Sequence, residues 1–145
     1  MREVTFEAPR AAVMERARMV TAYTASRRGA DVYENLAAAA SDDELLERYW
    51  REALAGVAAA FREWSPVADD GGVTLLLPAR YDDRLTARAA TALFDALSGS
   101  VAGQWLATAG AQEDAERVSA EAQSALAAFS AMVNSKRRPV RADYA

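Results

Sequence analysis

The stretch "LTARAATALFDALSGSVAGQWLATAG", Leu85 to Gly110, decides the fold that we predict for this chain. Apolar side chains recur every fourth residue along it, at Leu85, Ala89, Leu93, Leu97, Val101 and Trp105. In a helix of 3.6 residues per turn this spacing forms one apolar stripe, so it predicts a long helix with one buried face. Asp82 or Asp83 is suited to cap the start of the helix, and Gly110 to end it.

Two glycines, Gly99 and Gly103, interrupt this stripe. Each costs about 1 kcal/mol in a helix interior, so the pair indicates either a break near residues 98–100 or the close approach of a second backbone. A last helix is predicted from Gln112 to Asn134. Its expected buried side consists of Ala115, Val118, Ala122, Ala125 or Leu126, Phe129, and Met132 or Val133.

Two short strands are predicted upstream of the long helix. Apolar and polar residues alternate in "EVTFEAP" (Glu3 to Pro9), and a short apolar run, Val73 to Leu77, lies between a glycine and a proline. The residues between Asp69 and Gly72 have turn chemistry. Because a lone pair of strands is marginal in water without backing, we expect Val4 to Ala8 to pair with the second strand against the helices.

The remaining segments predict further helices. One runs from Pro9 to Arg28, and a short one, preceded by the Asp31 and Glu34 capping pattern, covers "VYENLAAAA" (Val32 to Ala40). A longer helix begins after Ser41, with Glu44 at the matching capping-box position, and ends before Ser65 and Pro66. The predicted fold class is mainly α, with four to five antiparallel helices packed on a small two-stranded antiparallel β-ribbon. Residues 1–134 form a single helical domain, and residues 135–145 form a basic extended tail.

The amino-acid composition excludes several classes of catalytic and metal-binding site. The chain of 145 residues contains no cysteine and no histidine, which excludes disulfides, thiolate metal sites and every histidine-based catalytic group. Its single lysine, Lys136, lies in the tail, so lysine chemistry is not expected either. We predict no enzymatic activity, cofactor, metal site or small-molecule substrate. The start of the chain lacks a secretory pattern and no segment approaches 20 apolar residues, so no membrane contact is expected.

Three acidic pairs are candidate cation sites: Asp42 with Asp43, Asp69 with Asp70, and Asp82 with Asp83. A calcium loop needs oxygen ligands at alternate positions with a closing glutamate, and none of the pairs has that spacing. Carboxylates at helix starts and turns accept hydrogen bonds from free N–H groups. We therefore expect all three pairs to be structural.

The stretch "NSKRRPVR" (Asn134 to Arg141) is basic in an acidic protein. Residues 1–134 contain 13 basic and 20 acidic residues, a net charge of −7, whereas residues 135–145 contain four and one, a net charge of +3. Three interpretations are open: a solvated tail favoured by the helix dipole, an arm that contacts an acidic patch of another subunit, or a nucleic-acid contact, which the acidic body would oppose. The candidate partner-binding residues here are Lys136, Arg137, Arg138 and Arg141.

The three tryptophans, Trp50, Trp64 and Trp105, lie on apolar stripes and are expected mainly in the core. Trp64 is predicted at a helix end, beside Ser65 and Pro66, so it is the one placed to reach the surface as an interface anchor. We therefore add Trp64 to the candidate partner-binding residues.

The order of features in the second half resembles a known family. A short strand leads into "LPARYDDRLTARAATALFDALSGSVAGQWLATAG" (Leu77 to Gly110), and the last helix continues as "SALAAFSAMVNSKRRPVRADYA" (Ser124 to Ala145). This order resembles small structural proteins of bacteriophages and prophages of the head–tail connector, or adaptor, family. The resemblance covers about the last 70 residues best.

The resemblance implies a helical subunit that assembles as a ring between portal and tail, performs no chemistry and lets DNA pass through its channel. Its implied partners are copies of itself and neighbouring portal or tail proteins, with no sequence-specific nucleic acid. It would occur in the bacterial cytoplasm during assembly and then in the virion. Two alternatives remain open: a soluble helical adaptor or regulatory protein-interaction module, and an enzyme that works without histidine.

Overall fold

The computed structural model of this protein describes residues 1–28, 37–38 and 42–135. Within these residues the fold is mainly α with a small sheet, so the predicted fold class is confirmed. The elements are β1 (Arg2–Glu7), α1 (Arg10–Arg28), α3 (Asp43–Ala60), the 3-10 turn η2 (Arg62–Trp64), β2 (Val67–Asp69), β3 (Gly72–Leu77), the 3-10 turn η3 (Asp83–Leu85), α4 (Thr86–Thr108) and α5 (Gln112–Val133). The predicted short helix over Val32 to Ala40 falls outside the described residues except at Ala37 and Ala38.

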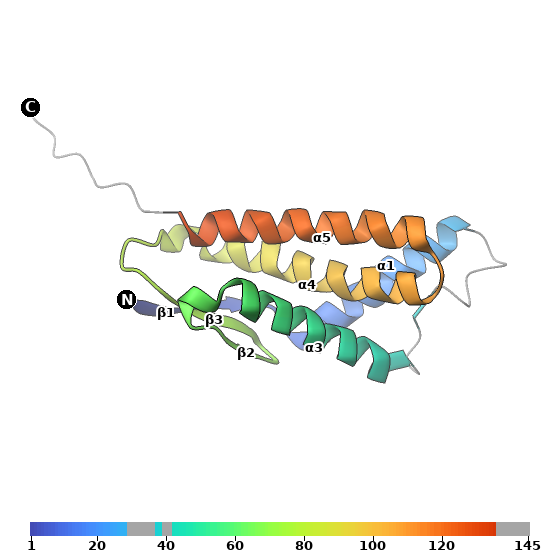
Figure 1. The fold of residues 1–145 in the computed structure, drawn as a ribbon, viewed down its shortest axis with the longest axis horizontal. Coiled ribbons are helices and arrows are strands. Elements are labelled where there is room, and N and C mark those ends of the chain that lie inside the picture. The colour runs from blue at the N-terminus through green and yellow to red at the C-terminus, as the bar shows by residue number, and fades with distance from the viewer. Residues whose placement is uncertain (29–36, 39–41, 136–145) are drawn as a thin grey trace, which may run out of the picture.

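Helix α4 is the centre of the fold. It lies beside α5 along most of its length (Figure 1), and α1, α3 and β1 also pack on it. The predicted stripe is its buried face, since Leu93, Leu97 and Val101 are at most 1% exposed. Because other elements surround α4 on several sides, eleven of its residues are buried, more than a single stripe supplies.

The two glycines of α4 lie where α5 comes closest. A β-carbon at Gly99 would lie 2.9 Å from the Cβ of Ala122, and one at Gly103 would lie 2.5 Å from the Oγ of Ser119. Real Cβ atoms do not approach this closely, so only glycine fits at either position without rearrangement. Helix α4 runs through both residues, which means that the close-approach interpretation is right and the predicted break is wrong.

The sheet is antiparallel with the strand order β1-β3-β2. The predicted pairing of the two apolar strands is confirmed, with Val4 opposite Leu75 and Phe6 opposite Val73. These four side chains cover the helices, and each is at most 9% exposed. The prediction of a two-stranded ribbon is wrong in one respect, because β2 adds a third strand to β3. Strand β2 has only three residues, all exposed, so it carries no apolar alternation that a sequence pattern could detect.

The helix ends follow the predicted chemistry with one shift. Gly110 ends α4 at φ 87°, and the N–H of Ala111 donates to the carbonyl of Leu106 over 2.9 Å, as in a Schellman motif. Asp82 accepts a hydrogen bond from the N–H of Arg84, so it caps the 3-10 turn η3 that leads into α4 and not α4 itself. At the start of α3, Asp42 occupies the N-cap without a side-chain capping bond. Ser41, the predicted cap, lies outside the described residues.

Three phenylalanines join the sheet to the helices. The ring of Phe129 on α5 meets Phe6 of β1 and Phe61 at the end of α3 edge to face, with ring centroids 5.0 and 5.1 Å apart. Phe6 and Phe129 are fully buried. This cluster holds the end of α5, from which the basic tail continues, against the sheet.

Candidate partner-binding surface

Trp64 lies in the 3-10 turn η2, directly after α3. Ser65 follows in the left-handed region at φ 49° and turns the chain toward β2. As predicted, Trp64 is only half-buried, whereas Trp50 and Trp105 belong to the core at 4% and 9% exposure. The indole Nε1 of Trp64 is enclosed and has no hydrogen-bond partner among the described residues.

Trp64 forms one wall of a pocket of about 210 Å³. The other lining residues are Pro78, Arg80, Tyr81, Val133, Asn134 and Ser135. Tyr81 is 3% exposed and its hydroxyl shares a hydrogen bond of 3.0 Å with Thr86. Burial raises the pKa of the Tyr81 phenol above its usual value near 10, so the phenol stays neutral. The pocket is therefore mainly apolar, with one cation from Arg80 at its wall.

The same pocket marks the base of the basic tail. Asn134 and Ser135 are the last described residues and follow α5 directly. The side-chain amide of Asn134 donates to the carbonyl of Ser130 over 2.8 Å, which extends the last turn of α5 by one polar contact. Trp64 and Ser135, the residue from which the tail continues, thus line one pocket.

The other predicted site residues, Lys136, Arg137, Arg138 and Arg141, lie outside the described residues. Sequence reasoning missed Tyr81, Arg80 and Pro78 as neighbours of Trp64. Residues 64 and 135 are far apart along the chain, and no periodicity relates two segments at that separation. Only the packing of α5 against the sheet brings them together.

The three acidic pairs have structural roles wherever contacts are defined. Asp43 forms an ion pair with Arg18, and Asp83 lies 3.5 Å from Arg2. Asp69 accepts a hydrogen bond from the N–H of Gly71 in the turn between β2 and β3. Within residues 1–28, 37–38 and 42–135, no group of three or more acidic side chains is placed to hold a metal ion.

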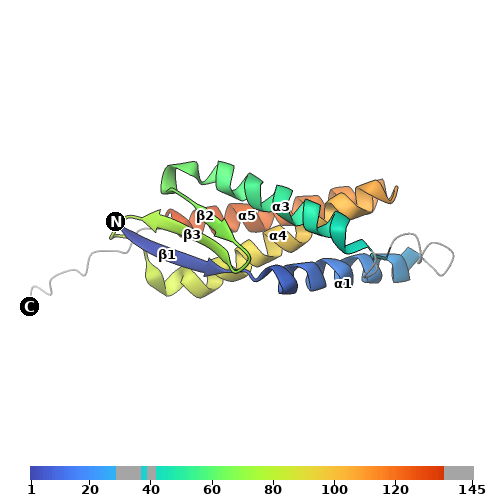
Figure 2. The ribbon, with the colours of Figure 1, turned by 90° about the horizontal axis from the view of Figure 1, so that it is seen from below.

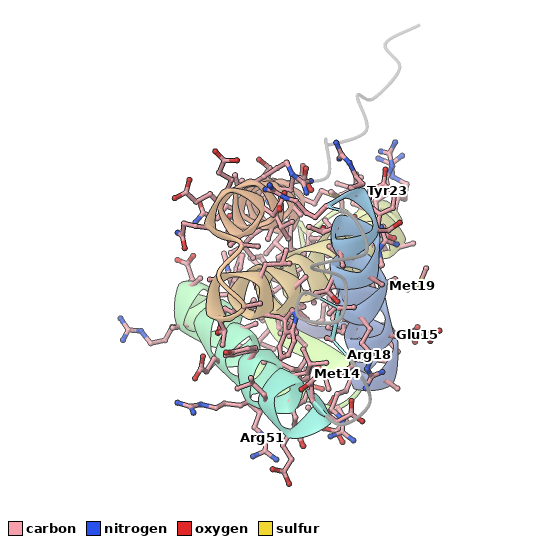
Figure 3. The ribbon with its side chains drawn as sticks, turned by 90° about the vertical axis from the view of Figure 1, so that its right-hand side faces the viewer. Met14, Glu15, Arg18, Met19, Tyr23 and Arg51 are labelled. Atoms are coloured by element: carbon pink, nitrogen blue, oxygen red, sulfur yellow. The ribbon has the colours of Figure 1, made fainter. Side chains whose placement is uncertain are left out.

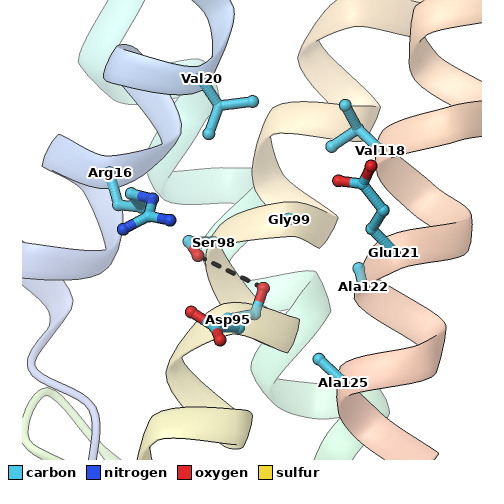
Figure 4. Close-up of a pocket in the computed structure, with 9 residues that line it drawn as sticks. All are labelled: Arg16, Val20, Asp95, Ser98, Gly99, Val118, Glu121, Ala122 and Ala125. Carbon is cyan, nitrogen blue, oxygen red and sulfur yellow. Dashed lines mark hydrogen bonds between the residues drawn. The ribbon is translucent and has the colours of Figure 1, made fainter.

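A second pocket, of about 250 Å³, lies between α1, α4 and α5 (Figure 4). Its floor contains small residues, among them Gly99 and Ala122, and its rim carries Arg16, Asp95 and Glu121. The hydroxyl of Ser98 donates to the carbonyl of Phe94 over 2.8 Å. This hydroxyl is therefore engaged by its own helix, as is common for serine in helices, and the chain offers no histidine to activate it.

The end of α1 is tied to the start of α5 by charge. Arg28 donates to Asp114 over 2.8 Å and approaches Glu113, and Arg117 also contacts Asp114. The hydrogen bond from Arg28 to the Asp114 carboxylate raises the pKa of Arg28. Thr24 lies nearby, and its buried hydroxyl has no hydrogen-bond partner in the part of the chain that the structure describes. The geometry is that of an ion-pair network that holds two helix ends together.

Helix α1 also presents two exposed apolar side chains. Met19 is 61% exposed and Tyr23 66%, and both project outward from α1 on the same side as Glu15 (Figure 3). They are four residues apart, so they form one small apolar pair. Such a pair is a second candidate for contact with another protein, on a face different from that of the Trp64 pocket.

None of the described helices is both long and apolar enough to cross a membrane. Comparison with protein-family models, curated proteins and solved structures found no match to this chain.

Proposed function

We propose that this chain is a non-enzymatic structural subunit of a phage or prophage particle, of the head–tail connector type. In this role it assembles as a ring with copies of itself and contacts neighbouring portal or tail proteins. The proposal starts from the order of features that resembles that family. The observation that carries it furthest is the position of Trp64, whose half-buried ring shares a pocket with Ser135 at the base of the basic tail.

This position supports a contact role because it combines two kinds of recognition. The pocket supplies an apolar wall formed by Trp64, Pro78 and Val133. The tail that begins there carries a net charge of +3 on a body of net charge −7, so it is attracted to another copy of the same body. A tryptophan at the centre and charges around it are typical of protein interfaces.

A non-enzymatic role is supported by the residue types that the chain lacks and by the contacts that its carboxylates already make. The chain lacks histidine and cysteine. Several of its carboxylates, such as Asp43, Asp82 and Asp114, are taken up by ion pairs or caps.

A second candidate function is a soluble helical adaptor or regulatory module. The observation that favours it is the exposed pair of Met19 and Tyr23 on α1, neither of which lines the Trp64 pocket. An adaptor would use this face for a different protein and would not need the tail for self-association.

The test is the absolute mass in solution over a wide concentration range, by light scattering or sedimentation, for four chains. These are the full chain, the chain that stops after Ser135, Trp64→Ala, and the double variant Met19→Ala with Tyr23→Ala. We expect a higher oligomer of the full chain that is lost on truncation and weakened by Trp64→Ala, with the double variant unchanged. An oligomer that survives truncation but dissociates in the double variant would overturn the proposal in favour of the adaptor.

A further inference from the structure

One long edge of the sheet is open. Strand β1 pairs only with β3, and no other strand of the described structure lies on its far side. The N–H of Ala8 donates to the carbonyl of Gly71 over 2.9 Å, so even-numbered residues of β1 direct their backbone groups toward β3. Backbone direction alternates along an antiparallel strand, which leaves the N–H and C=O groups of Glu3, Thr5 and Glu7 on the open side.

The side chains of these three residues lie on the solvent face of the sheet. Glu3, Thr5 and Glu7 are exposed, whereas Val4 and Phe6 point to the core. Seen from below, the sheet lies in front of α4 with β1 along its border (Figure 2). No described cation forms an ion pair with either glutamate. The open edge is therefore a row of unpaired peptide groups flanked by two uncompensated negative charges.

Charged residues on an edge strand usually prevent unwanted pairing between sheets. Glutamates on the edge repel an acidic strand. Pairing with a neutral strand is also unfavourable, because the glutamates lose part of their hydration and gain no opposite charge. A basic strand gains from them. The edge of β1 is thus selective for one kind of added strand, and the chain itself carries a segment of that kind in its tail.

The position and the length of the tail fit this edge. Ser135 shares a pocket with Pro78 and Tyr81, directly after the end of β3 that pairs with Arg2. The tail therefore leaves the body at the Arg2 end of β1. Its ten residues, 136–145, reach about 33 Å when extended, and pairing along Glu3 to Glu7 needs about half of that length.

We propose that the tail of one copy adds to β1 of a second copy as a fourth, antiparallel strand. The proposal rests on the function proposed above and names the surface that receives the arm. A tail that returned to its own β1 would start at the Arg2 end and run parallel to it. A neighbour's tail can run antiparallel, as every other pair in this sheet does.

Pro139 sets the alternation of the added strand. It has no N–H, so it must face away from β1, and the donors toward β1 are Lys136, Arg138 and Val140. Residues directly opposite each other in an antiparallel pair share one face of the sheet. We place Arg138 opposite Thr5, so that Lys136 lies opposite Glu7 and Arg138 lies diagonally between the two glutamates, whereas Arg137 projects from the other face. Neighbouring residues of equal charge thus have different roles.

The test uses full-length chains and the natural absence of cysteine. Chains with Thr5→Cys are mixed with chains that carry one tail cysteine, at Arg138 or, as the matched control, at Arg137. Mild oxidation then links chains whose cysteines meet. We expect about fivefold more linked dimer with Arg138→Cys than with Arg137→Cys, because side chains alternate between faces along a strand. Equal yields would mean that the tail is attracted by charge without forming a strand, and would overturn the proposal.

A chain that carries both Thr5→Cys and Arg138→Cys separates the two directions of pairing. A disulfide that forms within the monomer, with no linked dimer in the mixture, would overturn pairing between copies. Melting curves of each variant confirm that Thr5→Cys leaves the fold intact, since this change also removes the hydrogen bond of 2.8 Å between Thr5 and Thr74.

Charge reversal provides the second measurement. In the mixture of Thr5→Cys and Arg138→Cys chains, Glu3→Lys with Glu7→Lys on the Thr5→Cys chain should lower the yield of linked dimer about tenfold, because the attraction between Lys136 and these positions becomes repulsion. The control, Glu15→Lys with Glu116→Lys, makes the same change in net charge on exposed helix faces and should leave the yield unchanged. Adding Lys136→Glu to the tail should restore it. Failure of this rescue would contradict the proposed register.

The two proposals can fail separately. A tail-dependent oligomer without links from the even-numbered tail positions would overturn the strand addition and leave the structural subunit standing. An oligomer that is indifferent to truncation after Ser135 would overturn the arm itself.

Discussion

The seam between α4 and α5 and the open edge of β1 are two long surfaces of the same small fold. The seam is formed by Gly99, Gly103, Ser119 and Ala122. These side chains are so small that the two helices come into contact. At the edge, backbone donors and acceptors are left toward solvent, and the side chains beside them are long and charged. A permanent contact consists of small and apolar residues. A surface that binds a partner keeps polar groups, which form hydrogen bonds with water until the partner replaces the water.

The difference also separates two kinds of mutation. Changes at the seam and in the adjacent core should alter the free energy of unfolding. Changes at the edge and around the Trp64 pocket should alter association with little effect on folding. Substitutions in the core, at the seam and beside the pocket test this separation by their effect on folding, and the experiments on the tail test it by association.

The largest effect is expected at Phe129, where the helical part and the sheet meet. Phe129→Ala should lower the free energy of unfolding by about 3 to 5 kcal/mol, because it removes a fully buried ring and two edge-to-face contacts. Phe94→Ala removes the same ring from a half-buried site on α4 and should cost about 1 to 2 kcal/mol. Denaturant titration of both variants checks this, and equal losses would contradict the central position of Phe129.

The next largest change in the free energy of unfolding is expected for Gly→Ala substitutions, and its sign depends on whether another helix lies against the glycine. Gly99→Ala places a methyl group 2.9 Å from the Cβ of Ala122, so we expect a loss of about 1 to 2 kcal/mol despite the better helix propensity of alanine. Gly56→Ala in α3 meets nothing within 4 Å and should stabilise the fold by about 0.5 to 1 kcal/mol. Thermal and chemical unfolding should show opposite signs for the same chemical change. A gain at Gly99 would mean that the seam is loose.

These two cases also show how far sequence reasoning reached. The stripe of α4 and the alternation around Val4 and Phe6 predict their elements correctly, because local periodicity reports which face is buried. Gly99 allowed two interpretations, and only the position of Ala122 on a second helix decides between them. A choice that depends on a contact distant in sequence leaves no local pattern.

The candidate site was predicted less completely than the fold, for the same reason. The half-buried position of Trp64 follows from its place at a helix end. Its place in one pocket with Ser135 depends on where α5 ends, and the third strand and the open edge of β1 depend on the strand order. Glu3 and Glu7 were assigned to the solvent face by alternation alone. Alternation does not reveal whether a strand is central or at an edge, so the proposed role of the two glutamates is not visible in the sequence.

A smaller effect is expected at Ser65, beside the Trp64 pocket. Ser65 adopts φ 49°, a left-handed conformation that costs residues with a Cβ about 1 kcal/mol relative to glycine. Ser65→Gly should therefore raise the stability by up to about 1 kcal/mol, whereas Ser65→Ala retains the strain and serves as the control. A thermal melt compares the two. Destabilisation by glycine would mean that the side chain of Ser65 contributes more than its backbone costs.

The smallest effect should appear only in alkali and at Tyr81. Burial raises the pKa of this phenol in the folded chain above its value near 10 in the unfolded chain. Below pH 10 both states hold the proton, so the contribution of the neutral phenol to stability is complete. As the pH rises past 10 the unfolded state ionises first, and stability is lost up to the raised pKa of the folded state.

The free energy of unfolding of the natural chain should therefore fall more steeply above pH 10 than that of Tyr81→Phe. Tyr23→Phe removes a phenol from an exposed position and gives the baseline for a missing tyrosine. If Tyr81→Phe and Tyr23→Phe follow the same curve, the phenol of Tyr81 is open to water, and the pocket beside Trp64 is wetter than its packing indicates.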